Sequence, residues 1–265
     1  MRPLGPTGLD VPVVGTGTWQ SYDVDDPALV RPVTDAVLAR GARFFDSSPM
    51  YGAAERMLAA ALEGRRERAI VATKVWAPTA KEGRQQIARA LAWYGGVVDV
   101  YQIHNLQSWQ EHLPYLESLK AAGTVRAIGI THYAASQQAR LAEIAATGRI
   151  DTVQVPYNPR ERETEREVLP LAQGRGLGVI VMRPLGAGGL VRASPPAREL
   201  GFLEAFGLRT WAQALLNWGL SDPRVSVSIP ATRTVPHAVD NCEVGAARRF
   251  DAEARERVAA LAARL

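Results

Sequence analysis

Short apolar runs rich in β-branched residues alternate with longer segments in which apolar residues recur at helical spacing. The runs predict eight strands, at Val13–Trp19, Ala42–Ser47, Ala69–Trp76, Val97–His104, Val125–Thr131, Thr152–Tyr157, Gly178–Arg183 and Val225–Pro230. The other segments predict helices at Pro27–Arg40, Ala53–Arg65, Lys81–Tyr94, Trp109–Ala122, Ala135–Thr147, Thr164–Gly174, Leu208–Trp218, Val235–Ala247 and Asp251–Leu265. This alternation is the pattern of βα units, in which helices connect parallel strands.

Eight such units with no linker-like stretch between them predict one domain over residues 1–265, a (β/α)₈ barrel of the α/β class. The opening segment, Pro3–Val11, predicts a small hairpin that closes the bottom of the barrel. A doubly wound open sheet is the alternative. Such sheets usually carry Gly-x-Gly-x-x-Gly after the first strand, but here Gly15 and Gly17 are followed by Gln20 instead of a third glycine.

Four polar residues lie near the C-terminal ends of three successive apolar runs. Asp46 and Tyr51 follow Phe44–Phe45, Lys74 stands within the next run, and His104 ends the one after it. Parallel barrels carry their chemistry at the C-terminal ends of strands, so these side chains are predicted to share a site. A phenol, an ammonium, an imidazole and a carboxylate are the groups needed to move a proton onto a carbonyl oxygen. The set therefore indicates carbonyl reduction.

Composition narrows the remaining classes of function. Hydrophobic residues make up 47% of the chain and charged residues 22%, as in ordinary soluble globular proteins. A single cysteine, Cys242, excludes an intramolecular disulfide and a cysteine-ligated metal cluster. The four histidines lack metal-ligand spacing, so no catalytic metal is expected. No stretch approaches the roughly 20 apolar residues of a membrane span, and the N-terminus lacks the apolar core of a signal peptide. We expect a cytoplasmic protein that does not associate with membranes.

The charge of the chain is mildly positive. Lys and Arg number 31 against 27 Asp and Glu, for a net charge of +4. The arginines are scattered among helical segments, and the densest charged run, Arg160–Glu167, alternates in sign. This pattern indicates solvated surface rather than a nucleic-acid interface, while a positive surface favours a polyanionic cofactor.

With these residues in view, the sequence resembles the aldo-keto reductases over essentially its whole length. The resemblance rests on the ordered set Asp46, Tyr51, Lys74 and His104, each in a context similar to that of the family. It implies a (β/α)₈ barrel that binds NAD(P)H in an extended pose across the C-terminal ends of the strands, without a Rossmann domain. It also implies that Tyr51 is the proton donor, that Lys74 and Asp46 tune it, and that His104 orients the carbonyl.

The same resemblance implies a set of cofactor-binding residues. Thr131, His132 and Gln154 match residues that hold the nicotinamide carboxamide, and Met182–Gly186 matches the segment under the nicotinamide and pyrophosphate. Ile229–Arg233 and Asn241 resemble the clasp around the adenosine phosphate, with His237 where a basic residue is common. NADPH is favoured and NADH is possible. The full set is Gly17, Thr18, Trp19, Thr131, His132, Gln154, Met182, Arg183, Pro184, Leu185, Gly186, Gly188, Ile229, Ala231, Thr232, Arg233, His237, Asp240 and Asn241.

Trp19 and Trp76 each end a predicted strand and are candidate substrate-binding walls, suited to a small apolar or aryl carbonyl. The leading hypothesis is a reductase of aldehydes or ketones. One alternative is that the same site works as an NAD(P)⁺-dependent dehydrogenase of alcohols or aldoses. Another is a cofactor-sensing regulatory subunit that turns over slowly. We expect a monomer or a weak homo-oligomer whose partner is a small carbonyl compound.

Overall fold

A computed structural model of the protein describes residues 1–265. Eight parallel strands, neighbours in the order of the chain, form one sheet. They are β3 (Thr16–Gly17), β4 (Phe44–Asp46), β5 (Ile70–Val75), β6 (Val98–His104), β7 (Val125–Thr131), β8 (Thr152–Pro156), β9 (Gly178–Met182) and β10 (Val227–Ser228). Parallel bridges pair Val14 with Ser228 and Gly17 with Ala231, joining the two edge strands. The sheet is therefore a barrel, and the open-sheet alternative is excluded.

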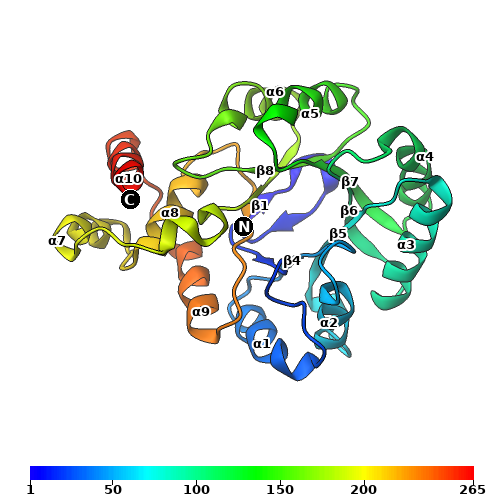
Figure 1. Ribbon diagram of the computed structural model, residues 1–265, viewed down its shortest axis with the longest axis horizontal. Helices are drawn as coiled ribbons and strands as arrows, with labels where there is room; N and C mark the ends of the chain where they lie inside the picture. Colours follow the sequence, from blue (N-terminus) through cyan, green and yellow to red (C-terminus); the bar gives the residue numbers. More distant parts are fainter.

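Helices surround the barrel on the outside (Figure 1). They are α1 (Arg31–Ala39), α2 (Ala54–Ala61), α3 (Ala80–Trp93), α4 (Trp109–Ala121), α5 (Gln138–Ala145), α6 (Val168–Arg175), α7 (Ala197–Leu200), α8 (Trp211–Leu220), α9 (Val235–Glu243) and α10 (Ala252–Arg264). The longest connection, from β9 to α8, contains α7 and two short 3₁₀ helices, Gly186–Val191 and Gly201–Phe206. The predicted (β/α)₈ architecture is confirmed.

The N-terminal hairpin closes one end of the barrel. β1 (Arg2–Pro3) pairs antiparallel with β2 (Asp10–Val11), and Figure 1 shows this hairpin in the middle of the ring of helices. Leu4, Leu9 and Val11 are buried in a cluster with interior-facing strand residues such as Phe44 and Ile180. The turn approaches β9 so closely that a Cβ on Gly5 would lie 2.3 Å from the Gly178 amide nitrogen. The predicted plug at the bottom of the barrel is therefore present.

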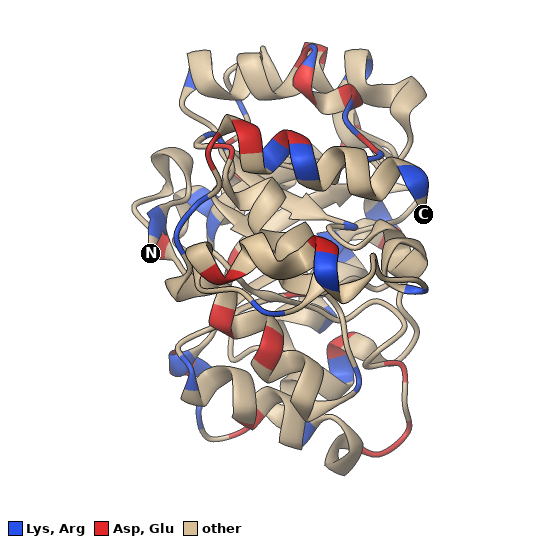
Figure 2. Ribbon diagram, turned by 90° about the vertical axis from the view of Figure 1, so that its left-hand side faces the viewer, with Lys and Arg blue, Asp and Glu red and all other residues tan.

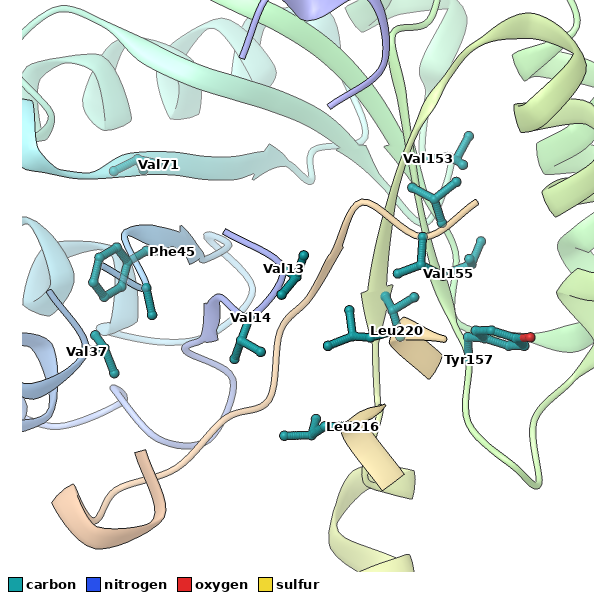
Figure 3. Close-up of a cluster of buried hydrophobic side chains, with 14 of the residues drawn as sticks. Val13, Val14, Val37, Phe45, Val71, Val153, Val155, Tyr157, Leu216 and Leu220 are labelled. Carbon is teal, nitrogen blue, oxygen red and sulfur yellow. The ribbon is translucent and has the colours of Figure 1, made fainter. Parts of the chain in front are cut away.

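A second and larger apolar layer lies between the strands and the helices, and Figure 3 shows part of it, including Phe45 of β4 and Val37 of α1. Phe44 and Phe45 are both buried but belong to different clusters, since successive strand residues point to opposite faces of the sheet. Every strand thus divides its side chains between the barrel interior and the helical shell. This division decides which polar residues can enter the interior.

The eight predicted strands all occur, but the first and last are much shorter than expected. Val13–Trp19 contributes only β3, and Val225–Pro230 contributes only β10, because these segments pair with one another through isolated bridges. The prediction also missed α7. The helix predicted at Leu208–Trp218 begins instead at Trp211, where Thr210 and Gln213 form a capping box.

The surface carries both signs of charge. Lys and Arg are interspersed with Asp and Glu on the visible face (Figure 2). Several form ion pairs across elements, such as Arg149 of the α5–β8 connection with Glu117 of α4 at 2.7 Å. None of the helices has the length and apolar character needed to cross a membrane.

Glu55 of α2 is a buried carboxyl group that makes the stability of the fold depend on pH. Burial raises its pKa from 4.5 to about 7, although a hydrogen bond from Thr73 opposes the shift. The folded state therefore binds the proton more tightly than the unfolded state. This contribution to stability is complete below pH 4.5 and is lost as the pH rises towards 7.

We predict that the unfolding free energy of the wild type falls between pH 5 and pH 8, and that in Glu55→Gln this fall is smaller by about 2–3 kcal/mol. Urea denaturation at the two pH values measures it. The control is Glu63→Gln, an exposed residue two positions beyond the end of the same helix. Identical pH dependence in the wild type and Glu55→Gln would show that Glu55 titrates normally.

Candidate active site

Three of the predicted catalytic residues enter the barrel through the two-residue periodicity of their strands. Phe44, Ala72 and Val100 belong to the interior apolar cluster. Asp46 and Lys74 each lie two residues later on their strands, and His104 lies four residues after Val100, so their side chains also point inward. The barrel interior therefore changes from apolar near the hairpin to polar near the C-terminal ends of the strands.

The centre of the polar layer is an ion pair between Lys74 and Asp46. Lys74 Nζ lies 2.7 Å from Asp46 Oδ2 and donates another hydrogen bond of 2.7 Å to the Ser47 carbonyl oxygen. The side chains are 0% and 2% exposed. Gln102 Nε2 donates to Asp46 Oδ1 at 3.1 Å, and Gln154 Nε2 reaches Oδ2 at 3.5 Å. The carboxylate thus has several donors and one cation.

These contacts keep the pair charged. Burial is the largest single influence and acts to lower the pKa of Lys74, but Asp46, Tyr51 and Glu55 together outweigh it, so the pKa of the ammonium is raised. Burial raises the pKa of Asp46, while the ammonium and the two amides oppose the shift. Because an ammonium at 2.7 Å stabilises the ionised carboxylate, we assign the pair as Lys74⁺–Asp46⁻.

Tyr51 lies above this pair, in the turn between β4 and α2. The Asp23 carboxylate accepts a hydrogen bond of 2.9 Å from the amide of Ala53 and so holds the turn. Lys74 Nζ is 5.2 Å from the centre of the Tyr51 ring, and the His104 ring meets the Tyr51 ring edge-on at 5.7 Å. Burial raises the pKa of Tyr51 more than Lys74 lowers it, so the phenol is protonated at neutral pH.

The environment of His104 keeps its imidazole neutral and favours one tautomer. Burial, with smaller contributions from Lys74 and His132, lowers the pKa of His104 to about 2. Its Nδ1 lies 2.7 Å from Ser48 Oγ, which accepts a hydrogen bond of 3.1 Å from the Met50 amide. His104 Nδ1 is the only hydrogen-bond acceptor within reach of the buried Ser48 hydroxyl, so we assign the hydroxyl as the donor to Nδ1. The ring proton then resides on Nε2.

A cavity of ≈ 940 Å³ opens at the C-terminal ends of the strands and reaches Tyr51 and His104. Most of the predicted site residues line it. They are Gly17, Trp19, Asp46, Tyr51, His104, Gln154, Met182, Arg183, Pro184, Leu185, Gly188, Ile229, Ala231, Thr232, Arg233, His237, Asp240 and Asn241. Lys74 lies behind Asp46 and Tyr51 and is not part of the wall.

Besides Lys74, five predicted residues do not line this cavity. The Thr18 hydroxyl is buried and donates to Ser47 Oγ at 2.9 Å, and Thr131 is buried at the end of β7. His132 caps its own loop, because its Nδ1 accepts a 3.0 Å hydrogen bond from the Ala134 amide. Gly186 lines a smaller adjoining hollow of ≈ 210 Å³. Trp76 is 40% exposed, outside the cavity wall.

Sequence analysis missed two groups of residues in the site. Gln102 could have been found, because it lies two residues before His104 on the same face of β6. Ser48 and the remaining wall residues come from loops and helices, where no periodicity marks them. That wall group comprises Gln20, Ser21, Met50, Asn105, Tyr133, Ala187, Val191, Ala193, Ser194, Thr210, Trp211, Ala212 and Pro230.

The side chains that line the cavity differ in chemistry from one part of its wall to another. Gln154 lines the cavity, and its Oε1 is buried without a hydrogen-bond partner, so this acceptor is not used within the protein. Met182 offers an apolar surface beside it, and Arg233 and His237 supply basic side chains along the β10–α9 side. No group of three or more His, Cys, Asp or Glu side chains is placed to hold a metal ion.

Comparisons of this sequence with known proteins all identify the same family. The family model described as Aldo/keto reductase family matches residues 13–263. A methylglyoxal reductase of Escherichia coli is 27% identical over 251 residues, covering 89% of this chain and 86% of its own. An L-galactose dehydrogenase of Arabidopsis thaliana is 31% identical over 220 residues, covering 74% of this chain and 68% of its own.

Solved structures agree with the sequence comparison. An aldo/keto reductase of Klebsiella pneumoniae, in complex with NADP and acetate, superposes with a TM-score of 0.82 at 25% identity, covering 97% of this chain and 93% of its own. The holo form of an aldo-keto reductase of Bacillus halodurans also has a TM-score of 0.82 at 25% identity, covering 98% and 95%.

The hydrogen bonds of Ser48 predict the protonation state of His104. In wild-type protein the ring should carry its proton on Nε2 and stay neutral at and below neutral pH until the pH approaches its pKa of about 2. ¹⁵N NMR of the ring nitrogens measures this, and the chain has only four histidines to assign. Ser48→Ala should introduce the Nδ1–H tautomer because Nδ1 loses its donor.

The control for this experiment is Ser47→Ala, since the Ser47 hydroxyl contacts Thr18 and not His104. It should leave the His104 ring signals in the wild-type pattern. A wild-type His104 protonated on Nδ1 would contradict the assignment.

Proposed function

Because the chain belongs to the aldo/keto reductase family, we propose that it is an NAD(P)H-dependent oxidoreductase that reduces aldehydes or ketones to alcohols. The observation that carries the proposal is the joint placement of Tyr51, His104 and the Lys74–Asp46 pair. A protonated phenol and a neutral imidazole face one cavity, and a buried ammonium lies 5.2 Å from the phenol ring.

Tyr51 is proposed to donate the proton to the carbonyl oxygen as negative charge develops there. In the protein without ligand its pKa is raised by burial, so it holds a proton to give. Loss of that proton creates a phenolate, which the charge of the nearby Lys74 ammonium stabilises, as its lowering effect on the pKa of Tyr51 indicates. Lys74 thus favours the product of proton transfer without removing the proton beforehand.

His104 and Asp46 have supporting roles in this proposal. With its proton on Nε2, neutral His104 donates a hydrogen bond to the carbonyl oxygen and stabilises the charge that forms on it. Asp46 keeps Lys74 charged and fixed, since its carboxylate raises the pKa of the ammonium. No proton needs to leave the buried pair.

The cofactor, when bound, supplies the hydride that reduces the carbonyl carbon. We propose that Gln154 binds the carboxamide through its unpaired Oε1 and that Met182 packs under the nicotinamide. Arg233 is proposed to bind the adenosine phosphate, aimed by its hydrogen bonds to the Gln20 carbonyl oxygen. The NADP complex of the Klebsiella pneumoniae relative supports this cofactor class, and Arg233 favours NADPH over NADH.

The mouth of the cavity indicates an apolar or aryl substrate. Trp19, Met50 and Tyr133 line it while remaining 41%, 45% and 48% exposed. Large apolar side chains that converge on an opening are typical of a ligand site. The similarity to a methylglyoxal reductase supports a carbonyl substrate in general terms.

Oxidation of an alcohol or aldose is the second candidate. The L-galactose dehydrogenase of Arabidopsis thaliana is 31% identical to this chain, and the same groups serve both directions, because a Tyr51 phenolate is a base. Comparing initial rates of carbonyl plus NADPH with those of alcohol plus NADP⁺ decides between them.

Tyr51→Phe tests the proposed proton donor. We expect kcat for reduction of aryl aldehydes to fall by about 100-fold or more, because general acid catalysis contributes about 10²–10⁴. NADPH affinity, followed by fluorescence, should be unchanged. The matched control is Tyr133→Phe, which removes a phenol from the rim of the same cavity. Equal turnover by Tyr51→Phe and the wild type would exclude the mechanism.

Arg233→Ala tests the proposed phosphate contact. A lost charge-assisted hydrogen bond should raise the KM for NADPH about 10-fold and leave the KM for NADH unchanged. Steady-state kinetics with both cofactors measures this. An equal increase for both cofactors would place Arg233 on a group that they share.

A further inference from the structure

The cavity contains two arginines, and they differ in what their guanidinium groups bind. Arg233 donates hydrogen bonds of 2.8 Å and 2.5 Å to the Gln20 carbonyl oxygen. The Arg183 guanidinium donates no hydrogen bond within the protein, and its one ion pair, with Glu161, is 3.5 Å long. Its N–H groups are therefore available to a ligand in the cavity.

The backbone of Arg183 is held in place although its conformation is unfavourable. Its φ is +51°, a region that residues other than glycine rarely adopt. The buried Asn158 side chain donates to the Arg183 carbonyl oxygen at 2.9 Å and to Glu161 Oε2 at 2.6 Å. One amide thus fixes both the backbone of Arg183 and the carboxylate of its counter-ion. Such strain, maintained by surrounding contacts, is common at ligand sites.

Arg183 acts on the part of the cavity that contains the reacting groups. Its guanidinium lies 4.9 Å from the centre of the Tyr133 ring, at the rim. The charge of Arg183 also lowers the pKa of the Tyr51 phenol. Its contribution is smaller than those of burial, Lys74 and Asp46. Arg233 and His237, by contrast, lie after β10 and on α9.

We propose that the Arg183 guanidinium is an anion-binding subsite for the substrate, so that this protein prefers aldehydes or ketones that carry a carboxylate. This inference rests on the proposed reductase function. A guanidinium binds a carboxylate through two parallel hydrogen bonds, which a neutral substrate cannot form. Glu161 holds the charge near the cavity but competes weakly, since both partners are about one third exposed, at 30% and 34%.

The test compares 4-carboxybenzaldehyde with its neutral analogue, methyl 4-formylbenzoate, at saturating NADPH. Wild type should prefer the carboxylate. Because the resemblance also places Arg183 near the cofactor, the readout is the ratio of the two substrates: Arg183→Gln should lower kcat/KM for the carboxylate about 10- to 100-fold more than for the ester. Glu161→Gln should raise kcat/KM for the carboxylate, because it removes the competing anion. Arg192→Gln, an equal change of charge at an exposed position nearby, should have no effect.

Two results would overturn the proposal. One is the absence of a wild-type preference for the carboxylate. The other is an equal loss for both aldehydes in Arg183→Gln with a higher KM for NADPH, which would assign Arg183 to the cofactor phosphates. Arg183→Lys adds a check. It keeps the positive charge but cannot form the two parallel hydrogen bonds of a guanidinium, so it should retain only part of the wild-type preference for the carboxylate.

Failure of the reductase function itself would be recognisable, because wild type would then reduce neither aldehyde. In that case the subsite is tested by calorimetric titration of the NADP⁺-saturated protein with 4-(hydroxymethyl)benzoate and its methyl ester. Binding of the anion alone, abolished in Arg183→Gln, would support the subsite. Equal binding of anion and ester, or no binding, would reject it.

Discussion

The buried ion pair between Lys74 and Asp46 is the interaction on which the site depends. Moving both charges out of water costs several kcal/mol for each ion, and their attraction offsets this only when other hydrogen bonds are also made. Here the Ser47 carbonyl oxygen, Gln102 and Gln154 supply them. Removing one partner would leave an uncompensated buried charge and would destabilise the folded state by about 3–5 kcal/mol. The pair therefore requires a rigid barrel around it and a stable, dry layer beneath it.

The N-terminal hairpin helps to provide that layer. Leu4, Leu9 and Val11 fill the lower barrel together with inward-facing strand residues, so the polar layer rests on apolar packing rather than on solvent. Low polarity below strengthens the charge interactions above. It also explains why His104 is neutral: burial and the nearby Lys74 both disfavour the imidazolium. The end of the barrel at the hairpin is therefore apolar packing, and the charged groups at the C-terminal ends of the strands depend on that packing.

Much of this arrangement is predictable from sequence, because strand periodicity is strict. Once Phe44 and Ala72 are placed inside, Asp46 and Lys74 must follow, and the same rule would have found Gln102. Other features have no local signal. Ser48 matters through its distance to His104, 56 residues away, and the short β3 and β10 result from closure of the sheet. Thr131 and His132 fit the pattern of a cofactor contact, yet burial and loop capping keep them off the cavity wall.

Unused hydrogen-bonding capacity distinguishes the parts of the site that await a ligand from those that are complete. The Asp46 carboxylate, the Lys74 ammonium and His104 Nδ1 all have partners, so they form a finished unit. Gln154 Oε1 and Gln102 Oε1 have none, but only Gln154 lines the cavity; Arg183 also lines it, and its guanidinium donates no hydrogen bond within the protein. A buried or strained polar group without a partner is costly, so a fold retains it where a ligand supplies the missing contact. By this reasoning we assign the amide oxygen of Gln154 and the cation of Arg183 to the proposed binding function, and the buried pair to the proposed catalytic scaffold.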